Sequence, residues 1–156
     1  MKTKLRCALA GLTLVAALGL APLLLAPAHA VDNMTSTDAP DLTSVRARIK
    51  AKDYAAALSE LRKLADDVQH ADVYNLLGFA LRKTGDFKTS LTYYTKAIEM
   101  APEHKAAREY LGELYVETGN MEKAKEQLAV LARLCPAGCE EREDLQKAIS
   151  AKSASN

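Results

Sequence analysis

The chain contains two consecutive stretches of equal length whose residue types match position by position. Residues 105–138 follow directly on residues 71–104 and repeat their pattern. A period of this length is typical of stacked units of two helices and a turn, because a single unit cannot bury its apolar face and must pack on a neighbour. The repeat therefore predicts an all-α solenoid of antiparallel helix pairs.

Glycines at matching positions predict how each helix pair is built. Gly78 and Gly112 are expected where the two helices of a unit cross, since only a small residue lets the backbones approach closely. A second glycine in each stretch precedes Asp or Asn, which predicts a left-handed turn and a cap on the following helix. These turn residues are Gly85, Asp86, Gly119 and Asn120.

Large, small and proline residues recur in a fixed order through both stretches. The order is carried by Tyr74, Leu77, Gly78, Leu81, Ser90, Tyr94, Ala97 and Pro102, and by Leu111, Gly112, Tyr115, Ala124, Leu128 and Pro136. It resembles the pattern of the tetratricopeptide repeat family. The resemblance implies a superhelix whose first helices line a concave face, and it implies a protein or peptide partner bound there.

Both flanks of the two stretches extend the array. Residues 52–54 align with the turn residues of the two copies, so residues 38–70 are expected to form a degenerate unit, although Val45 replaces the crossing glycine. Residues 139–151 predict an amphipathic capping helix, and residues 152–156 a disordered tail. About three repeats and a cap are close to the smallest array that buries a continuous core.

Residues 1–30 have the features of a secretory signal peptide. Three basic residues come before the apolar run 7–26, and the small residues around His29 predict cleavage after Ala30. The mature chain is then expected in the periplasm, with residues 31–40 as a flexible leader. The alternative is an uncleaved anchor, because about 20 apolar residues can span a bilayer.

Charge and motifs narrow the function classes. Loss of the signal peptide lowers the 21 basic residues to 18, against 20 acidic ones. This balance is not that of a protein that binds nucleic acid or an anionic membrane surface, and no second apolar run predicts membrane insertion after cleavage. The chain has no phosphate-binding glycine loop, zinc-protease motif or nucleophile elbow. We expect no enzyme activity, no cofactor and no resident metal.

Two cysteines, Cys135 and Cys139, remain in the mature chain. In an oxidising compartment their spacing predicts a disulfide between the last repeat helix and the capping helix. Two alternatives compete with it: a thiol-redox pair, and a copper site, because Cu(I) prefers soft sulfur ligands. A copper site would need a further ligand from His70, His104, Met100 or Met121.

The resemblance also assigns the positions that face the concave groove. An apolar strip of Ile49, Phe79 and Val116 is expected along it, between a basic N-terminal end and an acidic C-terminal end. Phe79 would anchor a peptide, or alternatively pack against the first unit or the leader. The groove-facing positions are Leu42, Arg46, Ile49, Lys50, Asn75, Phe79, Arg82, Lys83, Glu109, Glu113, Val116 and Glu117.

These observations predict an exported interaction module or scaffold that binds a peptide or partner protein in cell-envelope assembly or secretion. The alternative function is a periplasmic copper or thiol-redox carrier that uses Cys135 and Cys139. A third possibility is a homo-oligomer formed through the groove or a cap.

Overall fold

The structure, a computed structural model, describes residues 39–155. The predicted signal peptide and residues 31–38 of the predicted leader lie outside the described residues. Within them the chain forms seven helices and no strands, which confirms the all-α prediction. The helices are α1 (Thr43–Lys50), α2 (Tyr54–Asp67), α3 (Ala71–Lys83), α4 (Phe87–Met100), α5 (Lys105–Glu117), α6 (Met121–Leu134) and α7 (Glu140–Ala154).

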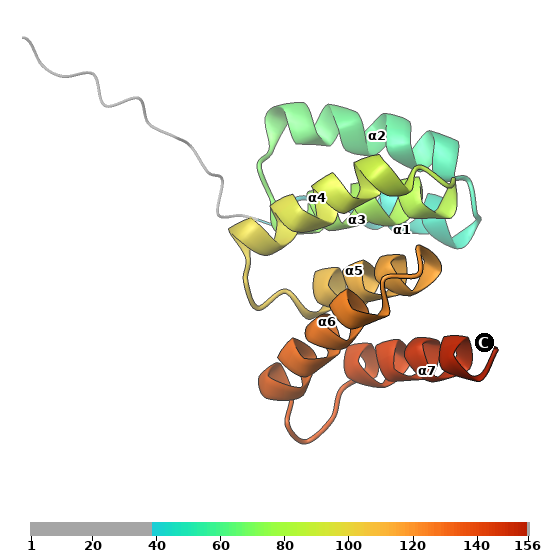
Figure 1. The fold of residues 1–156 in the computed structure, drawn as a ribbon. Coiled ribbons are helices and arrows are strands. Elements are labelled where there is room, and N and C mark those ends of the chain that lie inside the picture. The colour runs from blue at the N-terminus through green and yellow to red at the C-terminus, as the bar shows by residue number, and fades with distance from the viewer. Residues whose placement is uncertain (1–38, 156) are drawn as a thin grey trace, which may run out of the picture. The chain divides into compact units, whose positions relative to one another are not determined.

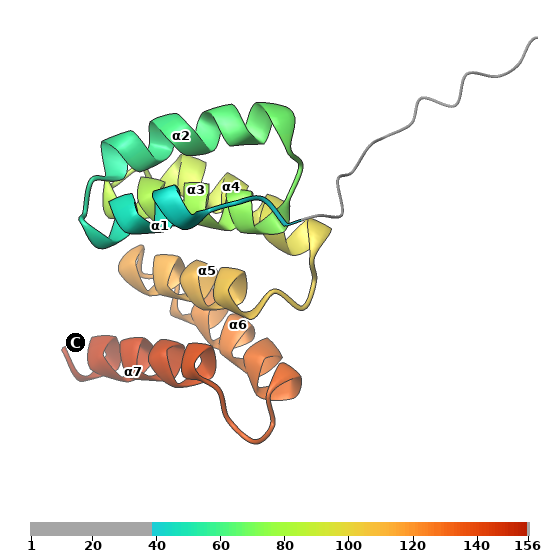
Figure 2. The same cartoon turned by 180° about the vertical axis from the view of Figure 1, so that it is seen from behind.

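The helices follow one another as antiparallel pairs, with α7 after the third pair. Each helix packs on the next in the chain, and α5 also contacts α3 and α7. In Figure 1 the second helices α4 and α6 lie toward the viewer, whereas in the reverse view of Figure 2 α1, α5 and α7 do. This is the helix-pair solenoid that the repeat period predicts.

The turns within the three pairs share one backbone conformation. Lys52, Gly85 and Gly119 adopt positive φ angles of 60°, 87° and 80°. The residue after each of them caps the second helix by accepting a backbone N–H hydrogen bond, at 3.1 Å for Asp53, 3.1 Å for Asp86 and 3.4 Å for Asn120. The caps predicted from the sequence are therefore confirmed, and the first pair forms the same turn with lysine in place of glycine.

The crossing in the second unit is as close as its glycine predicts. A Cβ atom on Gly78 would lie 2.7 Å from the Tyr94 ring of α4, and Tyr94 is fully buried. Ser90 Oγ donates a 2.7 Å hydrogen bond to the Gly78 carbonyl across the same contact. Absence of a side chain at position 78 lets α4 pack directly on α3.

Gly112 differs from the prediction, because its nearest neighbour belongs to the cap and not to its own unit. A Cβ atom there would overlap the Leu145 side chain of α7, and Leu145 is fully buried.

Helix α7 continues to Ala154, so residues 152–154 of the predicted tail are helical. No glycine or proline interrupts this C-terminal stretch, and no helix within residues 39–155 is long and apolar enough to cross a membrane.

Candidate functional site

The first helices of the three pairs border a small open cavity of about 210 Å³. We call it the first-helix pocket, and it is lined by Arg46, Ile49 and Lys50 of α1, Leu76 and Phe79 of α3, and Tyr110 of α5. Four of the twelve predicted groove residues, Arg46, Ile49, Lys50 and Phe79, thus come together around one cavity.

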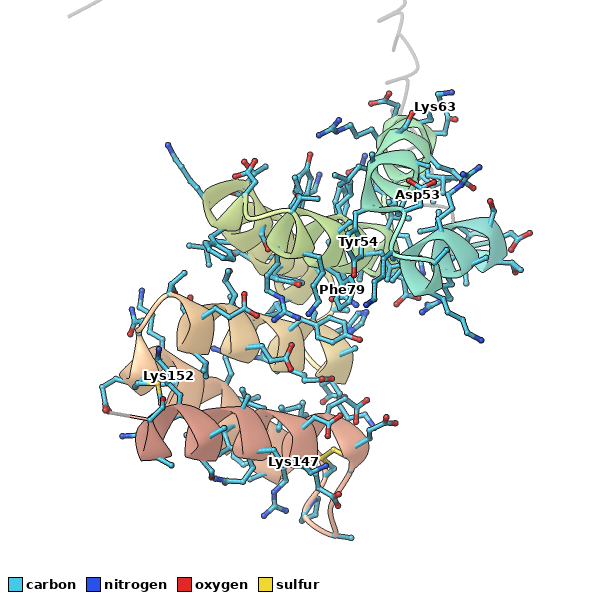
Figure 3. All side chains as sticks on the ribbon, turned by 90° about the vertical axis from the view of Figure 1, so that its right-hand side faces the viewer. Asp53, Tyr54, Lys63, Phe79, Lys147 and Lys152 are labelled. Carbon is cyan, nitrogen blue, oxygen red and sulfur yellow. A yellow bond between two sulfur atoms is a disulfide. The ribbon has the colours of Figure 1, made fainter. Side chains whose placement is uncertain are left out.

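Phe79 lies at the centre of an aromatic contact that joins all three units. Its ring is 6.5 Å from that of Tyr54 on α2, nearly edge-on, and 5.0 Å from that of Tyr110. Figure 3 shows Tyr54 and Phe79 close together beside α5. Phe79 therefore packs against the first unit and is half-buried, yet it still lines the first-helix pocket.

Arg82 is not available at the surface, contrary to the predicted basic end of the groove. Its side chain is 1% exposed and is held by an ion pair to each of two glutamates of the next unit. Nη1 donates to Glu117 at 2.7 Å, and Nη2 donates to Glu113. A basic groove position thus forms ion pairs with two acidic groove positions, and Arg82 links α3 to α5 inside the protein.

The remaining basic positions are exposed. Arg46, Lys50 and Lys83 have no acidic partner within salt-bridge distance among residues 39–155. Lys83 Nζ lies 5.3 Å from the centre of the Phe79 ring, at the edge of the aromatic contact. Among the predicted groove positions, the unpaired positive charge therefore lies on α1 and at the end of α3.

Glu109 is buried at the boundary between the third unit and the cap, with 8% of its surface exposed. Burial, followed by the negative charges of Glu113, Asp144 and Glu141, raises the pKa of Glu109 to about 8. Its carboxyl group is consequently mostly protonated at neutral pH. The acidic end of the predicted groove carries less charge than the sequence suggests.

The other predicted groove positions are enclosed to different degrees. Leu42, Asn75 and Val116 are buried. Asn75 Oδ1 has no hydrogen-bond partner among the described residues, and neither do Arg82 Nε and the Tyr94 hydroxyl. Burial also raises the pKa of Tyr94 well above its usual range. Helices α3 and α4 thus turn polar groups inward, toward the neighbouring helices.

The sequence reasoning missed two pocket residues, Leu76 and Tyr110. They are one repeat period apart, and each follows a predicted groove position, Asn75 or Glu109. The same period that located the repeats could have found them, because equivalent positions of successive first helices face the same way.

Cys135 is the C-cap residue of α6 and Cys139 is the N-cap residue of α7, so the two cysteines flank the loop between these helices. Their Cα atoms are 6.0 Å apart and their sulfur atoms are adjacent. The described part of the chain contains no group of three or more His, Cys, Asp or Glu side chains that could hold a metal ion. His70 and His104 instead accept backbone hydrogen bonds at the starts of α3 and α5, both at 3.2 Å.

Comparison with known proteins supports the assignment of the repeats. The sequence model of the tetratricopeptide repeat family matches residues 81–134, from the end of α3 to the end of α6. A protein of Guillardia theta described as "Uncharacterized protein ycf37" is 32% identical over 66 residues, which are 42% of this chain. The match spans 37% of that relative's length.

Proposed function

We propose that this chain, a tetratricopeptide repeat protein, binds a segment of a partner protein in the first-helix pocket. Repeats of this family are interaction modules, and the stacking of helix pairs presents successive first helices on one surface. The whole chain would act as a scaffold that recognises its partner without chemical change.

The observation that carries this proposal is the half-buried aromatic contact at an open cavity. Phe79 and Tyr110 pack against each other and both line the first-helix pocket. Aromatic side chains in a concave site are common anchors of protein interfaces, because they bury a large area at low entropic cost. A partner side chain in this pocket would cover apolar surface that is now exposed to water.

In vivo photo-crosslinking tests the location of the site. A photoreactive residue in place of Lys50, at the pocket rim, should give a discrete covalent adduct with the partner. The same residue in place of Lys63, an exposed lysine distant from Phe79 on α2 (Figure 3), should not. Adducts of equal yield from both positions would contradict the proposal.

Substitution of two different phenylalanines distinguishes binding in the pocket from binding to any exposed apolar side chain. Phe79→Ala should abolish the Lys50 adduct, while Phe87→Ala should leave it unchanged. Phe87 is 38% exposed and lies on α4, outside the pocket. Loss of the adduct in both variants would point to a different apolar face.

We further propose that the protein is exported, is cleaved after Ala30, and acts in the periplasm in cell-envelope assembly or secretion. The sequence of residues 1–30 supports export, and the adjacent sulfur atoms of Cys135 and Cys139 support a disulfide that joins α6 to α7. Intact-mass measurement without reductant should give a chain that begins at Val31 and is two hydrogens lighter than its reduced form. A chain that retains residues 1–30, or free thiols, would contradict these two proposals respectively.

A further inference from the structure

The first-helix pocket combines an apolar floor with a cationic rim. Its lining contains the apolar side chains of Ile49, Leu76 and Phe79, and the exposed cations Arg46 and Lys50 from the adjoining turns of α1. Lys83 approaches the Phe79 ring from the end of α3. Positive charge therefore comes from two helices around one apolar centre.

Arg46, Lys50 and Lys83 have no acidic partner in the described part of the chain. Two arginines of the same helices do have one. Arg48, also on α1, pairs with Glu60 of α2 at 2.8 Å. Arg82, one residue before Lys83, is neutralised by Glu113 and Glu117. The arginines that contact neighbouring helices are therefore paired with carboxylates of this chain. The cations at the pocket rim remain free to pair with a carboxylate of a partner.

Tyr110 adds a hydrogen-bond donor at the same place. Its hydroxyl group makes no hydrogen bond to any other residue within 39–155, although the side chain is half-buried. Burial, and the nearby carboxyl groups of Glu109 and Glu113, raise the pKa of Tyr110, so the phenol stays protonated. It can donate to a carboxylate that lies at the edge of the pocket beside the rim cations.

We propose that the first-helix pocket binds an acidic segment of a partner protein, with one aliphatic side chain in the pocket and side-chain carboxylates on either side of it. This inference rests on the proposed function and defines the chemistry of its partner. The cavity of about 210 Å³ is smaller than sites for cofactors or drug-sized ligands and matches a single side chain. Cations on both α1 and α3 favour carboxylates that flank this side chain along the segment.

The apolar and charged contacts have different roles in such a complex. The exposed ion pairs contribute little affinity because water and salt screen them, but they orient the segment and accelerate its association. The desolvated aliphatic side chain supplies most of the affinity. Binding should therefore depend strongly on both the pocket and the ionic strength.

Peptide display tests this chemistry. The protein, expressed from its full-length coding sequence with a C-terminal tag, is used to select from a library of short random peptides. Enriched peptides are synthesised with amidated C-termini, so that only side-chain carboxylates remain. We expect Leu, Ile, Val or Met with Asp or Glu close on both sides, and binding that weakens as salt is added.

Charge reversal at the rim provides the matched comparison. The double variant Arg46→Glu, Lys50→Glu should weaken binding of these peptides by about tenfold or more, because attraction becomes repulsion at two exposed positions. Lys63→Glu makes the same kind of change on α2 and should leave binding unchanged. Circular dichroism of each variant establishes that the helices are retained.

Four results would overturn the proposal, and they separate it from the proposed function. Enrichment of basic or uncharged peptides that still require Phe79 would overturn the acidic chemistry and leave the pocket as the binding site. Acidic peptides that bind the double variant as well as the wild type would do the same. Absence of enrichment, or binding that does not depend on Phe79, would overturn both.

Discussion

At the scale of single residues, Lys52 occupies a backbone conformation that the other two units assign to glycine. Its φ angle is 60°, against 87° at Gly85 and 80° at Gly119. A side chain in the left-handed region costs about 1–2 kcal/mol, because its Cβ atom crowds the following carbonyl oxygen. The turn before α2 is thus formed against the local preference of its sequence.

Replacement of Lys52 by glycine should stabilise the protein. Glycine relieves the crowding but gives back part of the gain as chain entropy, so we expect the free energy of unfolding to rise by about 0.5–1 kcal/mol. Urea denaturation followed by circular dichroism measures the change. Lys63→Gly, inside α2, is the control and should lower the free energy of unfolding by about 1 kcal/mol. Destabilisation by both changes would contradict the account of the turn.

Glu109 should make stability depend on pH. Its pKa is raised from 4.5 to about 8, so between these values the folded chain keeps a proton that the unfolded chain has released. The free energy of unfolding therefore falls as the pH rises through this window, by at most about 1.4 kcal/mol per pH unit, and the effect levels off above the folded pKa.

Glu109→Gln removes this titration while it keeps the shape of the side chain. Its melting temperature relative to the wild type should increase steadily from pH 5 to pH 8. Glu99→Gln, at an exposed position of α4, is the matched control for loss of a carboxyl group. A difference between Glu109→Gln and wild type that does not change with pH would contradict the buried, protonated state of Glu109.

At the scale of helices, the repeat predicts the elements well and their partners less well. The turns and caps follow from local residue types, which is why Asp86 and Asn120 cap the helices that they were expected to cap. The contact of Gly112 with Leu145 depends on whether α6 or α7 packs against this glycine. The repeat pattern contains no information on that tertiary contact. The end of α7 was missed because no glycine or proline marks it.

The Gly112 contact gives a prediction for the attachment of the cap. A methyl group in Gly112→Ala would overlap Leu145, so we expect a loss of about 1–3 kcal/mol in the free energy of unfolding. The addition of Leu145→Ala should make the double variant more stable than the sum of the two single changes predicts. The same substitution should not compensate Gly78→Ala, whose added methyl group meets Tyr94. Strict additivity at Gly112 would contradict direct packing of α7 on α5.

At the scale of the whole described chain, the surface differs from the predicted charge gradient because side chains of different units neutralise one another. Arg82 is paired to Glu113 and Glu117, which lie 31 and 35 residues further along the chain. Such pairs depend on side-chain rotamers and on how α3 sits against α5, so the sequence identifies the correct helices without identifying which charges remain free. The first-helix pocket retains Arg46 and Lys50 as free charges.

The central claim is that partners bind in the first-helix pocket, and amide chemical shifts test it most directly. An amidated peptide selected by display is titrated into the ¹⁵N-labelled protein. We predict that the largest shifts fall on α1, α3 and α5, around Arg46, Phe79 and Tyr110. Shifts concentrated instead around Phe87 and Lys123, which line a cavity among α4, α5 and α6, would contradict the account.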